Sequence, residues 1–198
     1  MPDESRGTAP GGNARDHPRR TRASRFAASS RGTARSGTIG ALRVRPAGLD
    51  DLEVIARLRV ALLREEAGNP LFARAHPRAL ARARRLTRAQ LARDHEVIFL
   101  AWHRSAPVGV LRCRENRTTP LVPNDRGAVV TTAYVLSGHR RRGVLRALLG
   151  AADTWCRQRG LSGMRLRCGL ANTGGQRAWR ALGFTPAELL LVRPVPGY

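Results

Sequence analysis

The hydrophobic pattern from residue 40 onward alternates between two periods along the chain. Apolar residues recur at every second position in some segments, as in half-buried strands, and at every third or fourth position in others, as in amphipathic helices. The first period predicts strands at Ala41–Ala47, Glu96–His103, Pro107–Glu115, Gly127–Leu136, Met164–Leu170 and Glu188–Pro194. The second predicts a helix that begins at Asp50 or Asp51, and helices at about Pro77–Arg93, Val144–Cys156 and Gln176–Leu182. Strands interleaved with helices indicate an α/β domain.

Residues 1–39 have a different composition from the rest of the chain. They are rich in Gly, Ser, Ala, Thr and Arg, and Phe26 is their single aromatic residue. Such a segment buries too little apolar surface to offset the entropy cost of ordering it. We therefore predict a disordered basic tail over residues 1–39 and one folded domain over residues 40–198. The tail is also compatible with a targeting peptide or with a start codon assigned upstream of the true domain.

The chain carries a formal net charge of +22, from 36 basic against 14 acidic residues. A charge of this size is typical of proteins that bind a polyanion such as nucleic acid. However, every basic residue is arginine and none is lysine, and alanine and glycine are abundant as well. This combination indicates a compositional bias of the whole sequence, so we do not expect nucleic acid to be the partner.

The cysteine and histidine positions argue against a disulfide framework and a metal site. Cys113, Cys156 and Cys168 are odd in number and show no C-x-x-C spacing, and the five histidines are scattered. We expect reduced, buried thiols, no bound metal and a cytoplasmic location. The sequence has no apolar run long enough to span a membrane, so no membrane partner is expected.

The stretch Ser137–Leu149, SGHRRRGVLRALL, lies between a predicted strand and a predicted amphipathic helix. Backbone N–H groups and the positive end of the helix dipole meet at such a turn, which makes it a ready anion site. Gly143 permits a positive φ and a close approach of a ligand to the backbone. The neighbouring arginines supply forked donors that suit phosphate oxygens, and a pyrophosphate has the right size for the turn.

The segment AYVLSGHRRRGVLRALL resembles the acyl-CoA-binding motif of the GNAT superfamily of N-acetyltransferases. Arg140 matches the leading Arg or Gln of that motif, and Gly143 matches its first glycine. The segment NTGGQRAWRALGF resembles the second signature of the family, with matches at Asn172, Trp179, Gly183 and Phe184. The order of predicted elements from Ile39 to the C-terminus also agrees with the family.

This resemblance implies a single α/β domain with a mixed, mostly antiparallel sheet, helices on both faces, and two central strands that splay apart. It implies acetyl-CoA as the acyl donor, without a metal. Tyr134, Val135 and Leu136 would run beside the pantetheine arm, and a backbone N–H of that strand would polarise the thioester carbonyl. The other cofactor-binding residues that the two motifs imply are Arg140, Arg141, Arg142, Gly143, Val144, Leu145, Arg146 and Asn172.

The chain departs from the family pattern at the catalytic positions. Trp179 stands where many members carry a tyrosine that protonates the leaving thiolate, and indole cannot supply that proton. Thr131 and Thr132 stand where other members often have a glutamate base, and Glu115 is the nearest acidic residue of the paired strands. Leu145 stands where Gly or Ala is usual. The sequence therefore does not identify the catalytic residues.

The function that follows from the resemblance is N-acetyl transfer from acetyl-CoA to a primary amine of a small molecule, peptide or protein, by direct attack. An acyl-CoA-binding regulator of the same fold with little catalysis is the alternative, and a basic nucleic-acid-binding protein is a remote one. The acceptor cannot be read from the sequence. The oligomeric state is equally open, a homodimer included.

Overall fold

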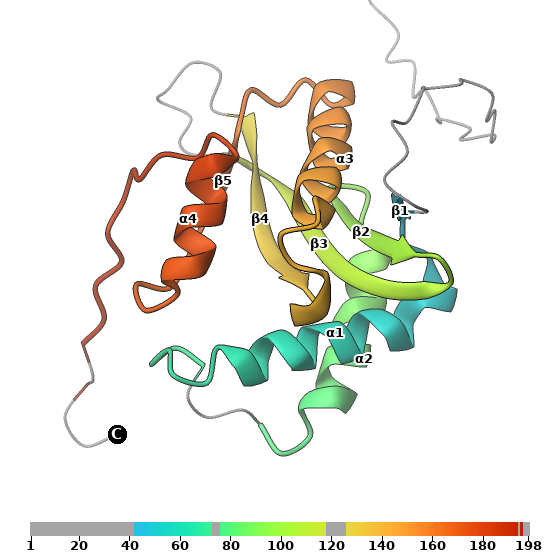
Figure 1. Ribbon diagram of the computed structural model, residues 1–198, viewed down its shortest axis with the longest axis horizontal. Coiled ribbons are helices and arrows are strands. Elements are labelled where there is room, and N and C mark those ends of the chain that lie inside the picture. Colours follow the sequence, from blue (N-terminus) through green and yellow to red (C-terminus); the bar gives the residue numbers. More distant parts are fainter. Residues whose placement is uncertain (1–41, 73–75, 118–125, 194, 196–198) are drawn as a thin grey trace, which may run out of the picture. The chain divides into compact units, whose positions relative to one another are not determined.

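The segments with alternating hydrophobicity form one five-stranded sheet (Figure 1). The structure is a computed structural model that describes residues 42–72, 76–117, 126–193 and 195. The strands lie side by side in chain order, and the first three neighbouring pairs are antiparallel whereas the last pair is parallel. The strands are β1 (Leu42–Pro46), β2 (Glu96–His103), β3 (Ala106–Arg117), β4 (Arg126–Val135) and β5 (Met164–Leu166).

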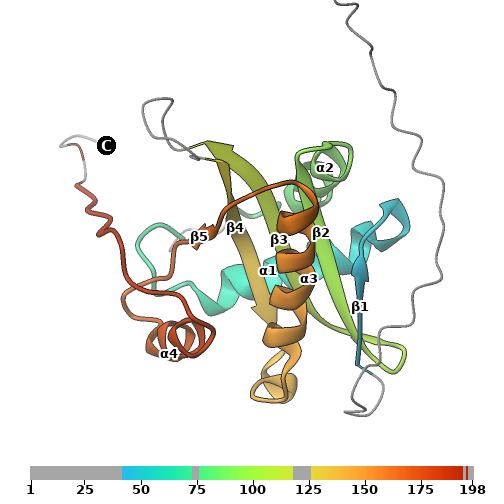
Figure 2. The same cartoon turned by 90° about the horizontal axis from the view of Figure 1, so that it is seen from above.

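Helices cover both faces of the sheet (Figure 2). One face packs against α1 (Leu52–Glu65) and α2 (Ala79–Leu91), and the other packs against α3 (Val144–Gln158). The fourth helix, α4 (Thr173–Ala181), follows β5 and contacts the α3 side through Trp179. This mixed, mostly antiparallel sheet with helices on both faces confirms the fold class expected from the sequence.

The core consists of two main apolar layers, one on each face of the sheet. The layer beneath α3 joins Leu148 and Ala152 of the helix to residues of β2, β3 and β4. The layer beneath α1 joins Ile55 and Leu58 to Ile98, Leu100 and Val110 of the central strands. The alternation along each strand therefore does not separate core from solvent, because both faces of the central strands are buried.

The pairing between β4 and β5 is much shorter than β4 itself. Only Ala128, Val129 and Val130 pair with β5, whose partner residues are Met164–Leu166. The later residues of β4, from Thr132 to Val135, continue to pair with β3 on their other side. The second half of β4 thus has one edge that no described strand pairs.

The sequence predictions differ from the structure mainly near the C-terminus. The strand expected over Glu188–Pro194 is not formed in its described part, where Leu189–Arg193 adopt no regular structure and expose their apolar side chains. A strand requires a hydrogen-bonding partner as well as apolar residues, and no described strand pairs with this segment. The strand expected over Met164–Leu170 ends at Leu166 for the same reason, since its pairing with β4 stops there.

The predicted helix start at Asp51 is correct in position but not in detail. Its carboxylate accepts hydrogen bonds from Arg45 at 2.7 Å and from the Gly48 N–H at 2.9 Å, and it makes no cap bond to the helix. The hydrogen bond from Arg45 lowers the pKa of Asp51.

The predicted tail, residues 1–39, lies outside the described residues. None of the described helices is long and apolar enough to cross a membrane.

Candidate active site

The turn between β4 and α3 has the backbone geometry of an anion site. Gly143 immediately precedes α3 and has a φ of 77°, and Arg141 has a φ of 59°. The first turn of α3 contains no acidic residue, and no described side chain caps it. The first N–H groups of a helix have no partner within the helix, so they remain available to a negatively charged ligand.

The space in front of this turn is open. A Cβ atom placed on Gly143 would meet no atom within 4 Å. Val144 is buried and Leu145 packs against the α3-side core, so the leucine side chain points away from the turn while its backbone stays part of it. Arg141, Arg142 and Arg146 have exposed side chains, and within the described part of the chain they form no ion pair.

Arg140 has a different arrangement from the other arginines of the turn. Its Nε donates to the carbonyl oxygen of Val135 at 2.9 Å, and one Nη donates to Glu65 at 2.6 Å. Its guanidinium also lies 5.7 Å from the centre of the Tyr134 ring. The guanidinium therefore joins the end of β4 to the end of α1 instead of projecting from the turn.

The edge of β4 that faces away from β3 carries unpaired backbone positions. The Leu136 N–H donates to Val108 on β3, so the backbone groups of Val135 point the opposite way, and by alternation those of Ala133 do too. The Val135 carbonyl on this edge is the one that Arg140 binds. The side chain of Val135 faces the α3-side core, whereas Tyr134 and Leu136 face the α1 side.

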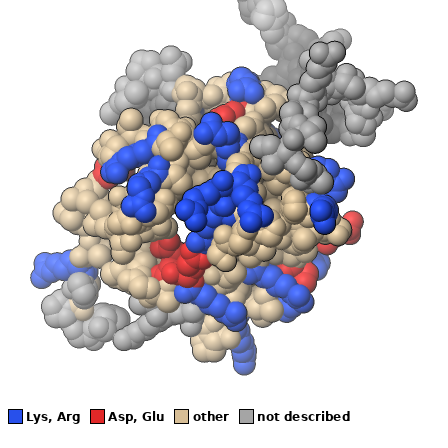
Figure 3. All heavy atoms as spheres, in the orientation of Figure 1, with Lys and Arg blue, Asp and Glu red and all other residues tan. Residues whose placement is uncertain are grey.

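Two glutamates at the end of α1 lie across from this edge. Glu65 binds Arg140, and Glu66 accepts a hydrogen bond from Asn172 at 2.8 Å. The hydrogen bond from Arg140 lowers the pKa of Glu65, and burial together with the Glu65 charge raises the pKa of Tyr134. Figure 3 shows a group of acidic side chains next to a larger group of arginines on this face. The end of α1 thus contacts both β4 and the start of α4.

Asn172, which the second motif predicts to bind the cofactor, has a structural role here. Its Oδ1 accepts a hydrogen bond from the Gly175 N–H at 2.8 Å, which caps α4, and its Nδ2 donates to Glu66. The structure therefore brings the turn, the open edge of β4 and the pair Glu65 and Glu66 together. It places Asn172 at the border of that region.

The sequence profile of the Acetyltransferase (GNAT) family matches residues 61–184, which include both motifs and every element from the C-terminal end of α1 to α4. The chain belongs to this family. No curated protein sequence matches the chain. Members of the GNAT family are acyl-CoA-dependent N-acetyltransferases that act on amine-bearing acceptors, so this chain is an enzyme of that class.

Solved structures of GNAT proteins share the fold of this chain. A GCN5-related N-acetyltransferase from Ralstonia eutropha JMP134 superposes with a TM-score of 0.63 at 24% identity, over 79% of this chain and 100% of that chain. A predicted acetyltransferase from Clostridium acetobutylicum, crystallised with acetyl-CoA, has a TM-score of 0.65 at 17% identity, over 77% and 96%. An aminoglycoside antibiotic 6′-N-acetyltransferase from Acinetobacter haemolyticus has a TM-score of 0.63 at 19% identity, over 77% and 97%.

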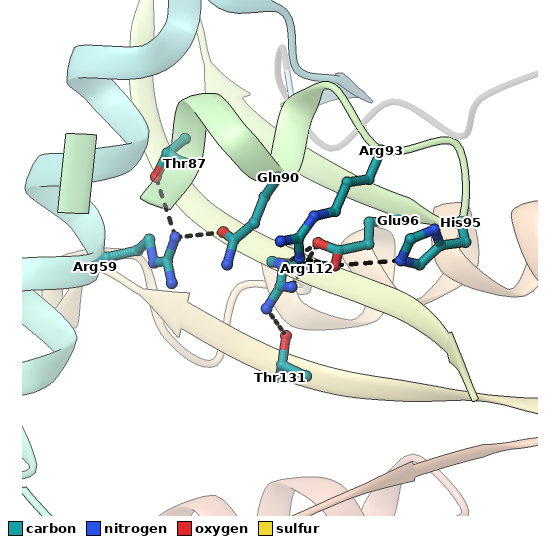
Figure 4. Close-up of polar contacts among 8 residues, drawn as sticks. All are labelled: Arg59, Thr87, Gln90, Arg93, His95, Glu96, Arg112 and Thr131. Atoms are coloured by element: carbon teal, nitrogen blue, oxygen red, sulfur yellow. Dashed lines mark hydrogen bonds and ion pairs between the residues drawn. The ribbon is translucent and has the colours of Figure 1, made fainter. Parts of the chain in front are cut away.

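A buried polar network supports β4 of this GNAT domain from the α1 side (Figure 4). Arg112 on β3 donates from Nε to Glu96 at 3.0 Å and from Nη1 to the Thr131 hydroxyl at 2.7 Å. The Glu96 side chain is only 1% exposed and also accepts from Arg93 at 3.0 Å. Burial raises the pKa of Glu96, but hydrogen bonds from Arg112 and Arg93 outweigh it, so the net pKa lies below the usual range. Nearby, Arg59 binds Thr87 and Gln90 on α2.

Neither of the two catalytic positions considered from the sequence supplies a proton at the open edge, because Glu115 lies away from it and the indole of Trp179 has no proton to give. Glu115 pairs with Arg159 and Arg126 near the opposite end of β3, so its carboxylate is engaged there. Trp179 packs against the α3-side core and makes an edge-on contact with Phe184, with ring centres 5.3 Å apart. In the described residues, no group of three or more His, Cys, Asp or Glu side chains is placed to hold a metal ion.

The cysteines of this acetyltransferase are free thiols with suppressed ionisation. Burial raises the pKa of Cys113 to about 12 and that of Cys156 to about 11. Burial and the nearby Glu66 charge also raise the pKa of the more accessible Cys168. At neutral pH all three are therefore neutral thiols.

Sequence reasoning missed Glu65, Glu66 and the pair formed by Glu96 and Arg112. Glu65 is 75 residues from Arg140, and Glu96 is 16 residues from Arg112. The sequence did carry a signal for Glu65 and Glu66, because two consecutive glutamates at a helix end are unusual in a chain with only 14 acidic residues. Nothing in the local pattern distinguishes Arg112 from the many exposed arginines.

Proposed function

We propose that this protein transfers the acetyl group of acetyl-CoA to a primary amine by direct attack, with the turn between β4 and α3 holding the pyrophosphate of the donor. The observation that carries the proposal is the unpaired edge of β4 directly beside that turn. A pantetheine arm requires an extended edge with free backbone groups. A pyrophosphate requires converging N–H donors and positive charge.

The residues of the turn fit this ligand. The backbone N–H groups of Gly143, Val144, Leu145 and Arg146 belong to a helix start that no described side chain caps. Arg141, Arg142 and Arg146 supply positive charge without a competing carboxylate in the described part of the chain. Arg140 would contribute through its backbone and through its hold on Val135, because its guanidinium is bound to Glu65.

The reaction needs few proton-transferring groups in this site. The nitrogen lone pair of a neutral amine forms the new C–N bond at the acyl carbon, the C–S bond breaks, and its electron pair leaves on the CoA sulfur. The amine gives up one proton, which passes to solvent or to an acidic side chain. The N–H groups of Ala133 and Val135 point to the open edge, where they favour the negative charge that develops on the acyl oxygen.

The acceptor would enter from the α1 side, where Glu65 and Glu66 lie beside the open edge. Their negative charge favours the approach of an amine that is protonated in solution. Both carboxylates would orient an incoming protonated amine by electrostatic attraction, and the amine would compete with Arg140 and Asn172 for them, because these residues already donate to the two carboxylates.

A thiol-release assay with acetyl-CoA and a panel of amines tests the proposed function directly. The panel includes a polyamine, a peptide with a free amino terminus, free amino acids and an aminoglycoside. We expect calorimetric binding of acetyl-CoA at sub-millimolar concentration and CoA release with at least one acceptor class. Binding without release by any amine would favour the regulatory alternative, and absence of binding would reject both.

The Trp179→Phe variant tests whether the position of the usual tyrosine has a catalytic role in this chain. We expect kcat to change by far less than the roughly 100-fold that the loss of a general acid costs. The reason is that indole carries no transferable proton and Trp179 contacts Phe184 and the core. Steady-state kinetics checks the prediction, with thermal denaturation to record the packing loss. A fall in kcat of more than about 100-fold would contradict it.

A further inference from the structure

Thr131 occupies an irregular position on β4. Arg112 of β3 is opposite Thr132, and Cys113 is opposite Val130, so Thr131 is an extra residue in the β3–β4 ladder. The pairing of β4 with β5 also ends at Val130. Thr131 is therefore both a bulge and the first residue of the unpaired edge. Bulges of this kind change the direction of a side chain and are frequent next to active sites.

The Thr131 hydroxyl is held by a guanidinium that cannot move freely. Arg112 is 8% exposed, and its Nε and second Nη are bound to Glu96, whose side chain is almost completely buried. The remaining Nη donates to Thr131 at 2.7 Å. Figure 4 shows the Thr131 side chain pointing to Arg112 from β4. The buried ion pair thus fixes the donor that holds the hydroxyl.

This contact determines what the hydroxyl can do. A guanidinium only donates hydrogen bonds, so the Thr131 oxygen acts as the acceptor and its own O–H must donate elsewhere. No acceptor for that proton lies among the described residues, and the Thr131 residue is exposed. The positive charge of Arg112 polarises the hydroxyl and strengthens it as a donor. The structure therefore leaves one O–H donor, on an oxygen held in place by Arg112, at the start of the unpaired edge.

We propose that Thr131 is a catalytic residue whose hydroxyl donates a hydrogen bond to the acyl oxygen of the thioester, and that Arg112 and Glu96 position it. This proposal rests on the proposed function. The acyl oxygen gains negative charge as the amine nitrogen bonds to the acyl carbon, and it loses that charge when the C–S bond breaks. A donor that does not have to reorganise stabilises the charge between these two events. Thr131 transfers no proton in this step.

Thr131→Val removes the hydroxyl and keeps a β-branched side chain of similar size, while Thr131→Ser keeps the hydroxyl. Thr154→Val is the matched control, because Thr154 is an exposed residue on α3 whose hydroxyl likewise accepts a hydrogen bond from an arginine, Arg157, at 2.9 Å. The measurements are kcat and KM for both substrates, and calorimetric affinities for acetyl-CoA and for CoA. Circular dichroism checks that each variant is folded.

We expect Thr131→Val to lower kcat by about 10-fold to 100-fold, toward the range found when one oxyanion donor is removed. Its affinity for acetyl-CoA should fall by about threefold to tenfold, the value of one neutral hydrogen bond. Its affinity for CoA, which has no acyl oxygen, should stay unchanged. Thr131→Ser should restore most of both losses, and Thr154→Val should behave like the unmodified protein.

The proposal is overturned if Thr131→Val matches Thr154→Val in kcat, or if it weakens CoA as much as acetyl-CoA. A rise only in the KM of the amine would also overturn it, since the hydroxyl would then contact the acceptor. These results leave the proposed function intact, because the unmodified protein still turns over. If the unmodified protein binds no acetyl-CoA, the proposed function fails, and the role of Thr131 fails with it.

Discussion

Replacement of Gly143 by valine is expected to abolish acetyl-CoA binding while the domain stays folded. Gly143 has a φ of 77°, a region that β-branched residues avoid at a cost of order 1–3 kcal/mol. A Cβ at this position would meet no atom within 4 Å, so the cause is backbone strain and not a clash. Relief of the strain would rotate the N–H groups that open α3 away from their common direction. Isothermal titration calorimetry measures the loss of affinity.

Gly160→Val provides the matched control for this experiment. Gly160 has a φ of 64° and lies just beyond the other end of α3, and a Cβ added there would likewise meet no atom within 4 Å. This variant should lose a similar amount of thermal stability and keep its affinity for acetyl-CoA. Retained affinity in Gly143→Val would show that the donor binds at another place. Equal losses of affinity in the two variants would show that strain in α3, and not the turn, is responsible.

Glu96→Ala is expected to lower the free energy of unfolding by about 3–5 kcal/mol, because it leaves the buried Arg112 guanidinium without its carboxylate. Urea denaturation followed by circular dichroism measures the change. Glu53→Ala is the control, since Glu53 also binds two arginines, Arg57 and Arg84, but its side chain is 40% exposed. Exposed ion pairs contribute little, so we expect a much smaller loss there. Similar losses in both variants would contradict the prediction.

The stabilisation by Glu96 should also depend on pH. The folded-state pKa of Glu96 lies below the ordinary glutamate value of 4.5, so the folded state favours the ionised carboxylate. The stabilisation is therefore complete above pH 4.5 and is lost as the pH falls from there through the folded-state pKa. The difference in stability between the unmodified protein and Glu96→Ala should shrink over the same range. A difference that grows on acidification would have the wrong sign.

The elements that can be predicted from the sequence are those with strong local signals. The sequence predicts Glu96–His103 with the ends that the structure shows, and it predicts the start of α3 at Val144, because alternation in the first case and an Arg/Gly turn in the second are local features. The predicted strand Glu188–Pro194 is wrong over its described residues, because an apolar run does not reveal whether a partner edge exists.

The candidate site shows the same division between local and long-range information. Gly143 can be identified from its motif, and its positive φ agrees with the reason given for a glycine there. The orientation of the Arg140 guanidinium cannot be predicted, because it depends on Glu65 in a distant helix. The capping role of Asn172 is a local feature, since the residue accepts a hydrogen bond from Gly175 three positions later. The resemblance to the family motif led instead to a predicted contact with the cofactor. The Thr131 bulge depends on the register with β3, which one strand alone does not encode.

The state of the three thiols has a practical consequence for a reaction that releases CoA. Disulfide exchange proceeds through the thiolate, and pKa values of about 12 and 11 leave almost no thiolate at Cys113 or Cys156 near neutral pH. These two residues are thus poorly disposed to attack a disulfide by exchange. A colorimetric disulfide reagent added to follow turnover should meet a low protein background, confined mainly to Cys168. The burial that packs the sheet against α3 thus also keeps these two thiols from adding to a measurement of released CoA.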